Sequence, residues 1–134
     1  MVTRQKVKEM ILHLFEAVNS GDLSVLDRLS EEYFAADYVW HFPGVTDLPP
    51  GPAGMKKVNR EILADNPNFT VMLDDLIVEE DKMAIRCTMQ RTDPSTGKAQ
   101  HGFFLTFIRL AGDQFTEEWE LISPWRIKHK AARA

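Results

Sequence analysis

A histidine and a glutamate in this sequence could exchange protons near neutral pH, and both lie close to aromatic side chains. His41 follows Trp40, and Glu117 lies two residues before Trp119. An imidazole titrates near neutrality and can give or take a proton. Desolvation in an apolar pocket raises the pKa of a carboxyl group, which would make Glu117 usable as an acid or a base. We therefore predict that His41 and Glu117 form the catalytic pair of an acid/base enzyme.

Each of these residues also has a structural interpretation. His41 could be a half-buried histidine that hydrogen-bonds a loop carbonyl. Glu117 could form an ion pair with Arg86 on a neighbouring strand and so hold the sheet together. Arg86 could instead bind an anionic group of a substrate or an enolate oxygen.

The other predicted binding residues are aromatic and would form the walls of a pocket for a small apolar molecule. Trp40 and His41 are adjacent in a predicted strand and must face opposite sides, so only one of them can line that pocket. The predicted substrate-binding residues are Tyr38, Trp40, Arg86, Phe104 and Trp119.

The sequence contains none of the common motifs for binding a metal or a nucleotide cofactor or for a serine nucleophile. It contains no His-Glu-x-x-His, no Gly-x-Ser-x-Gly, no Walker loop and no dinucleotide-binding fingerprint. A single cysteine, Cys87, cannot make an internal disulfide or a cysteine-rich zinc site, and its alternating neighbours favour a buried free thiol. We expect neither a metal nor a cofactor.

Length and composition restrict the class of protein. The 134 residues make one domain, and 44% hydrophobic with 27% charged residues is typical of a globular protein. The net charge of −4 gives no electrostatic footprint for nucleic acid. No apolar run approaches the ~18 residues of a membrane span, and the first nine residues are charged and polar. We expect a cytoplasmic location, with no membrane and no nucleic acid as partner.

Three helices are predicted in the first half of the chain. Gly21 is a plausible C-terminal cap of the first helix, Asp22 an N-terminal cap of the second, and Pro52 the first residue of the third. The apolar spacing of the first helix follows one helical face, with Val7, Met10, Ile11, Leu14, Phe15 and Val18.

Strands dominate the rest of the sequence. A short one covers Asp37–Phe42 between the second and third helices. Helices followed by a strand meander indicate an α+β fold, with three N-terminal helices packed on a curved, mostly antiparallel sheet. Four long strands are predicted at residues 69–78, 83–91, 98–110 and 114–123.

The turn at residues 111–113 suggests a register for the last two strands. Pairing Leu110 with Phe115 would place Glu117 and Trp119 on one face together with Phe104. Both faces would then hold large apolar groups, and such strands are usually covered on both sides. The helices cover one side, and we expect a second subunit on the other, which gives a homodimer. That second face would carry Phe103, Leu105, Phe107, Glu118, Glu120 and Ile122.

Five short segments occur in order along nearly the whole chain: YVWHFP at 38–43, GPAGM at 51–55, EEDKMAIR at 79–86, TGK at 96–98 and FTEEW at 115–119. In this order they resemble the SnoaL-like polyketide cyclases, a family within the nuclear transport factor 2-like superfamily. The resemblance implies a single cone-shaped SnoaL-like domain over residues 1–134 with a ligand-binding cavity.

Two positions depart from the family pattern. Many members carry an aspartate four residues beyond the tryptophan of the last strand, and the cyclases use an aspartate from this region as acid/base. Ser123 stands at this position, and it has no usable proton equilibrium near neutral pH. Gln90–Asp93 replaces the histidine–glycine segment of the family.

Two functions therefore remain open. The first is an enzyme without a cofactor, acting as a cyclase, isomerase or dehydratase on a small hydrophobic carbonyl compound, which the retention of His41 and Glu117 favours. The second is a non-catalytic small-molecule-binding or dimerisation module, which the loss of the aspartate at Ser123 favours.

Overall fold

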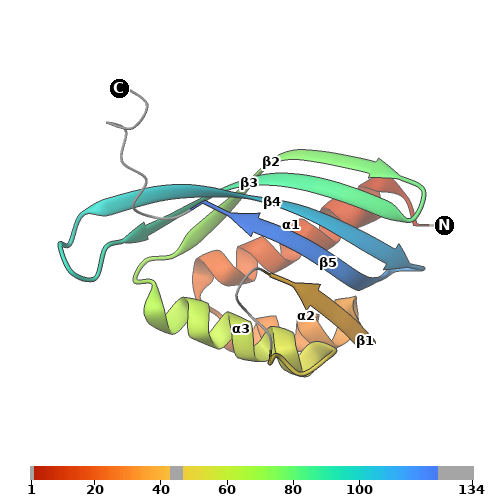
Figure 1. The fold of residues 1–134 in the computed structure, drawn as a ribbon, viewed down its shortest axis with the longest axis horizontal. Helices are drawn as coiled ribbons and strands as arrows, with labels where there is room; N and C mark the ends of the chain where they lie inside the picture. The colour runs from red at the N-terminus through yellow and green to blue at the C-terminus, as the bar shows by residue number, and fades with distance from the viewer. Residues whose placement is uncertain (1, 43–46, 124–134) are drawn as a thin grey trace.

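A computed structural model describes residues 2–42 and 47–123 of the chain. Three helices and one five-stranded sheet form the α+β fold that the sequence predicts (Figure 1). The helices are α1 (Arg4–Ser20), α2 (Leu23–Tyr33) and α3 (Pro52–Asp65). The strands are β1 (Phe34–His41), β2 (Thr70–Glu79), β3 (Lys82–Thr92), β4 (Ala99–Ala111) and β5 (Gln114–Ile122).

The helix ends lie where the capping residues predict them. Thr3 caps α1 by accepting a hydrogen bond from the backbone N–H of Lys6. Gly21 ends α1 in the left-handed conformation, with φ of 67°, a conformation that costs glycine little. Asp22 accepts from the N–H of Val25 and so starts α2. None of the helices in the described parts of the chain is long and apolar enough to cross a membrane.

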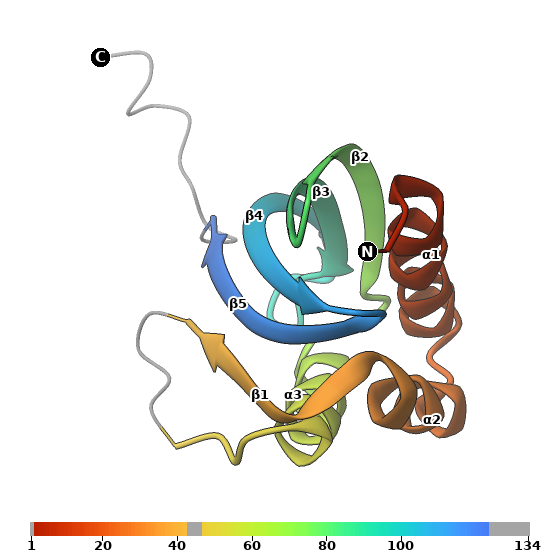
Figure 2. The same cartoon turned by 90° about the vertical axis from the view of Figure 1, so that its right-hand side faces the viewer.

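The sheet has the strand order β1-β5-β4-β3-β2. Neighbouring strands are antiparallel except for β1, which runs parallel to β5, so the sheet is mostly antiparallel as predicted. In Figure 2, α1 lies beside β2, and α2 and α3 lie near β1 at the other edge. We call the sheet face packed against the helices the inner face, and the opposite face the outer face.

The strand β1 starts earlier than the prediction of Asp37. It begins at Phe34, directly after α2, because Phe34 pairs with Phe115 of β5 and the two rings pack with centroids 5.1 Å apart. The pairing is then irregular up to Val39. In this interval the carbonyl of Tyr38 accepts a hydrogen bond from the N–H of Gly51, so the start of α3 is tied to β1.

The predicted register of the last hairpin is wrong by one residue beyond its turn. Leu110 does pair with Phe115, but Arg109 pairs with Glu117, so Thr116 is an extra residue in β5. Such a β-bulge shifts every following side chain to the other face. The Thr116 hydroxyl donates a hydrogen bond to the carbonyl of Arg109, 3.3 Å away, and this contact supports the bulge.

The bulge reverses the predicted faces of β5. Glu118 pairs with Ile108 and lies on the inner face, whereas Glu117 and Trp119 lie on the outer face. The predicted second face, which the homodimer would cover, therefore loses Glu118, Glu120 and Ile122. It keeps its apolar character, and the homodimer stays a prediction. Its exposed apolar residues include Met72, Ile77, Phe103, Leu105, Phe107, Trp119 and Leu121.

Between the helices and the inner face lies the hydrophobic core. Cys87 is fully buried there and free, which confirms the predicted buried thiol. Burial raises the pKa of this thiol to about 12, so it is not a thiolate at neutral pH.

Candidate functional site

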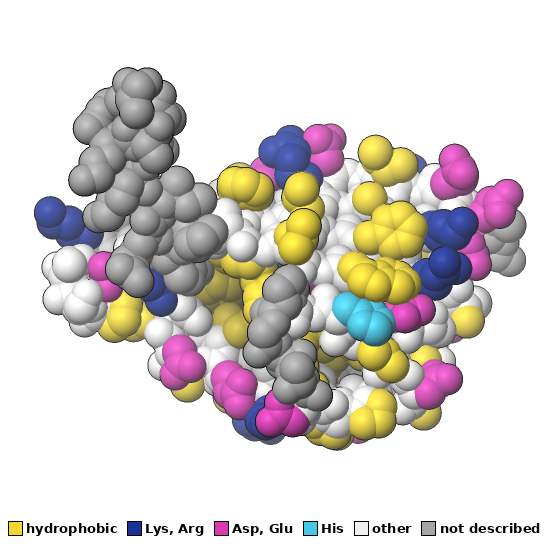
Figure 3. Space-filling view, in the orientation of Figure 1, with side chains coloured by type: hydrophobic (Ala, Val, Ile, Leu, Met, Phe, Trp, Pro, Cys, Tyr) yellow, Lys and Arg dark blue, Asp and Glu magenta, His cyan; other side chains and the backbone are white. Residues whose placement is uncertain are grey.

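Two hollow spaces meet at the C-terminal end of β1. The larger is an open cleft of about 1120 Å³ that runs from the outer face around the ends of β1 and β5 to the start of α3. Figure 3 shows hydrophobic side chains gathered over this region, with a hollow beside them. The smaller is a cavity of about 150 Å³ between the helices and the inner face, which we call the inner cavity. Both are bordered by Trp40, Met55, Ile85, Thr106 and Glu120.

A carboxyl pair lies where the two spaces meet. The bulge at Thr116 turns Glu118 and Glu120 to the inner face, two residues apart on β5. Glu118 is buried, and its Oε1 accepts a hydrogen bond of 2.5 Å from the Tyr38 hydroxyl. The Oε1 of Glu120 accepts from the hydroxyl of Thr106 at 3.2 Å. The two carboxyl groups also lie close enough on this face that each affects the pKa of the other.

Two buried carboxyl groups this close to each other favour a state in which only one of them is ionised. Burial raises the pKa of Glu120 well above its ordinary value, and the neighbouring Glu118 raises it further. Burial also raises the pKa of Glu118, but the contacts of its carboxyl with Glu120 and with the Tyr38 hydroxyl oppose that shift. Glu120 is therefore the group that holds the proton, and Glu118, which accepts from Tyr38, is the carboxylate.

Tyr38 is the fixed partner of this pair. Its side chain is 2% exposed, and burial together with the charge of Glu118 raises its pKa. The phenol thus stays protonated and can only donate to Glu118. We expect Tyr38→Phe to lower the free energy of unfolding by about 1.5–3 kcal/mol, because the change removes a hydrogen bond to a buried charged group.

The matched control for this variant is the same substitution at Tyr33. The Tyr33 hydroxyl contacts exposed His13 at 2.8 Å on the helix side. Tyr33→Phe should cost less than Tyr38→Phe in urea unfolding. Equal losses for the two variants would show that Tyr38 does not support a buried charge.

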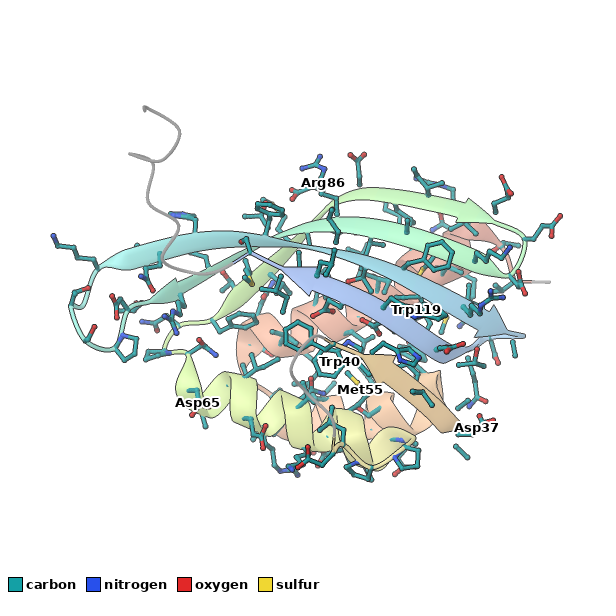
Figure 4. The ribbon with its side chains drawn as sticks, viewed as in Figure 1. Asp37, Trp40, Met55, Asp65, Arg86 and Trp119 are labelled. Atoms are coloured by element: carbon teal, nitrogen blue, oxygen red, sulfur yellow. The ribbon has the colours of Figure 1, made fainter. Side chains whose placement is uncertain are left out.

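The indole of Trp40 closes the junction from the side of β1. Trp40 is opposite Glu118 in the parallel pairing and stacks on Phe42, with ring centroids 5.1 Å apart. Figure 4 shows Trp40 beside Met55, between β5 and α3. The Nε1 of Trp40 is buried and has no hydrogen-bond partner among the described residues.

Comparison with known proteins identifies the family. A family model described as the SnoaL-like domain matches residues 11–118. This chain belongs to the SnoaL-like family. A search of curated protein sequences finds no match.

Solved structures share the fold of this SnoaL-like domain. IdmH from Streptomyces antibioticus, a proposed polyketide cyclase, is 28% identical, with a TM-score of 0.71 over 87% of this chain and 91% of IdmH. A proposed polyketide cyclase from Acidithiobacillus ferrooxidans is 22% identical, with a TM-score of 0.76 over 100% and 99% of the two chains. TsrD from Streptomyces laurentii is 21% identical, with a TM-score of 0.76 over 92% of both chains.

His41 and Glu117 are brought together, but not in the interior. The His41 Nε2 and Glu117 Oε2 atoms are 2.8 Å apart, and both side chains are substantially exposed. His41 stacks on Trp119, with centroids 5.1 Å apart, at the border of the cleft. The prediction that Glu117 points inward beside Trp119 is wrong, because the bulge at Thr116 moves both residues to the outer face.

The sequence predicts that only one of the neighbours Trp40 and His41 lines the pocket, and this prediction is wrong. Trp40 and His41 do face opposite sides, yet both border the cleft, because it wraps around the end of the strand. Tyr38 borders the cleft as well, and Phe104 borders the inner cavity.

Arg86 borders the cleft from the outer face, far from Glu117. Its guanidinium donates to the Oδ2 of Asp75 at 2.9 Å and lies 3.7 Å from Asp74. The predicted alternative of an Arg86–Glu117 ion pair is therefore wrong. The cross-strand partner of Arg86 on β2 is Asp75, whereas Glu117 lies on β5, beyond β4.

Ser123 has a structural contact in this SnoaL-like domain. Its Oγ accepts a hydrogen bond of 2.9 Å from the N–H of Phe103 and so closes the end of the β4–β5 pairing. Among the described residues, no group of three or more His, Cys, Asp or Glu side chains is placed to hold a metal ion. The acid/base groups of the interior are Glu118 and Glu120, which the sequence analysis placed on the opposite face.

Proposed function

We propose that this SnoaL-like domain binds a small, mostly apolar carbonyl compound and moves a proton at the carbon next to the carbonyl, using its own side chains. The observation that carries the proposal is the position of the Glu120 carboxyl, which borders both the cleft and the inner cavity and whose pKa is raised by burial. A carboxylic acid kept neutral by an apolar site can donate a hydrogen bond to a developing oxyanion. The likeness to IdmH, a proposed polyketide cyclase, supports the same substrate class.

The hydrogen-bond pattern suggests how the pair would act. Glu120 donates its proton to the carbonyl oxygen, and the Glu118 carboxylate takes the proton from the neighbouring carbon. The product is an enol, and the pair again holds one proton in total, so its charge does not change. Such an enol is the nucleophile of an aldol-type cyclisation and the intermediate of an isomerisation.

The sizes of the two spaces indicate the shape of the ligand. A dry protein cavity of about 150 Å³ accommodates a single benzene-sized ring, which is the volume of the inner cavity. The cleft of about 1120 Å³ leaves room for a much larger remainder. We propose that one ring or ring-sized segment enters the inner cavity while the remainder lies in the cleft against apolar side chains.

Hydrogen–deuterium exchange of a ketone tests the proposed chemistry without knowledge of the natural substrate. 1-Tetralone, a bicyclic ketone, carries exchangeable hydrogens beside its carbonyl, and their loss in deuterium oxide can be followed by proton NMR. We expect exchange to be faster with the folded protein than with buffer alone at the same pH. Equal rates would contradict the proposed proton transfer.

The alternative function is non-catalytic binding. It is favoured by Ser123, whose hydroxyl is engaged with the Phe103 backbone where cyclases of the family carry an aspartate. The exchange experiment separates the two functions, because a binding module would bind 1-tetralone without exchanging its hydrogens.

A further inference from the structure

The indole N–H of Trp40 is a buried hydrogen-bond donor without a partner among the described residues. A buried tryptophan N–H usually has a hydrogen-bond acceptor, because leaving a buried donor unpaired is costly. The Nε1 of Trp40 is buried without one among the described residues. Glu118, the cross-strand neighbour of Trp40, accepts a hydrogen bond from Tyr38 and not from the indole.

The position of Trp40 relates this donor to the carboxyl pair. Trp40 is opposite Glu118 across the β1–β5 pairing, and Glu120 follows two residues along β5 on the same face. Two residues along a strand span about 6–7 Å, which is within the reach of an indole side chain. Trp40 and Glu120 also both border the cleft and the inner cavity.

We propose that the Trp40 N–H and the Glu120 carboxyl form a two-donor subsite for one carbonyl oxygen of the ligand. This inference rests on the proposed function and adds the residue that would select ligands by their carbonyl group. Two donors that meet at one oxygen would hold the carbonyl at the junction of the two spaces. A compound of the same shape without that oxygen would leave Trp40 unpaired and bind more weakly.

NMR spectroscopy of the indole groups tests the subsite directly. Protein labelled with nitrogen-15 shows one indole signal for each of its three tryptophans, and Trp40→Phe identifies the signal of Trp40. The labelled protein is titrated with 1-tetralone and, in parallel, with tetralin, which has the same bicyclic skeleton and no oxygen. We expect 1-tetralone to move the Trp40 indole proton downfield and tetralin to leave it nearly in place.

The same titrations give the affinities of both compounds. A single neutral hydrogen bond contributes roughly 0.5–1.5 kcal/mol, so we expect 1-tetralone to bind the wild type up to about tenfold more tightly than tetralin. Trp40→Phe keeps an aromatic ring and removes the donor, so most of this preference, measured as the ratio of the two affinities, should disappear.

The inference is overturned if saturating 1-tetralone leaves the Trp40 signal in place, if tetralin moves it equally, or if 1-tetralone does not bind. It is also overturned if folded Trp40→Phe keeps the full preference for the ketone. Failure of the proposed function looks different, because the Trp40 signal would then shift with 1-tetralone while its hydrogens exchange no faster than in buffer.

Discussion

Glu120→Gln is expected to lower the rate of ketone hydrogen exchange by roughly a hundred- to ten-thousand-fold, the usual cost of losing a general acid or base. The variant should fold, because a glutamine amide has nearly the shape of the carboxyl, can accept from Thr106 as Glu120 does, and carries no charge. It cannot give up a proton to a carbonyl oxygen. The rate should therefore fall while ketone binding persists.

Glu117→Gln is the informative comparison on the same strand. The carboxylate of Glu117 lies on the outer face and contacts His41 at 2.8 Å. We expect the rate of ketone hydrogen exchange with Glu117→Gln to stay within a few-fold of the rate with the wild type. The opposite outcome, with Glu117→Gln nearly inactive and Glu120→Gln unaffected, would favour the pair of His41 and Glu117 that the sequence predicts.

Gly51→Ala should lower the free energy of unfolding by about 3 kcal/mol or more, from a strained left-handed backbone and a steric overlap together. Gly51 has a φ of 76°, and a Cβ at this position would lie 2.4 Å from the carbonyl oxygen of Ala36. That oxygen belongs to the backbone of β1 and cannot move aside without shifting the strand. The Gly51 N–H also donates to the Tyr38 carbonyl, so the change would disturb the support of the carboxyl pair.

Gly112→Ala separates the cost of the backbone conformation from the cost of the steric overlap in the free energy of unfolding. Gly112 also has a positive φ, of 60°, but no atom lies within 4 Å of the position of a Cβ. This variant carries only the conformational cost, about 1 kcal/mol. Urea unfolding of both variants measures the difference, and equal losses would show that the contact between Gly51 and β1 adds nothing.

Much of the fold could be predicted from local signals. The helix ends follow from Gly21, Asp22 and Pro52, whose backbone preferences act within one turn of the chain. The long strands follow from apolar and β-branched runs between turns, and they agree with the structure to within about two residues. The start of β1 at Phe34 was missed because its pairing with Phe115 is a contact between distant segments.

The interior of the site could not be predicted in the same way. The segment Phe115–Trp119 contains two adjacent glutamates, and the sequence does not show which of them points inward. One inserted residue at Thr116 decides this, and the position of a bulge depends on pairing with β4 rather than on the local sequence. The same shift places Glu118 beside Tyr38 and leaves Glu117 for His41.

The proposed function depends on Glu120 as a neutral acid at the junction of the two spaces. Carbon-13 NMR of the glutamate side-chain carboxyls measures this directly, with Glu118→Gln and Glu120→Gln used to assign the two signals. Because the folded protein raises the pKa of this carboxyl, its proton stabilises the native state at low pH, and that stabilisation is lost as the pH rises toward the folded pKa.

We expect the Glu120 signal to change with a midpoint well above 4.5, the ordinary value for a glutamate. A Glu120 signal with its midpoint at this ordinary value would show that Glu120 is ionised like any other glutamate and would overturn the proposed role of Glu120.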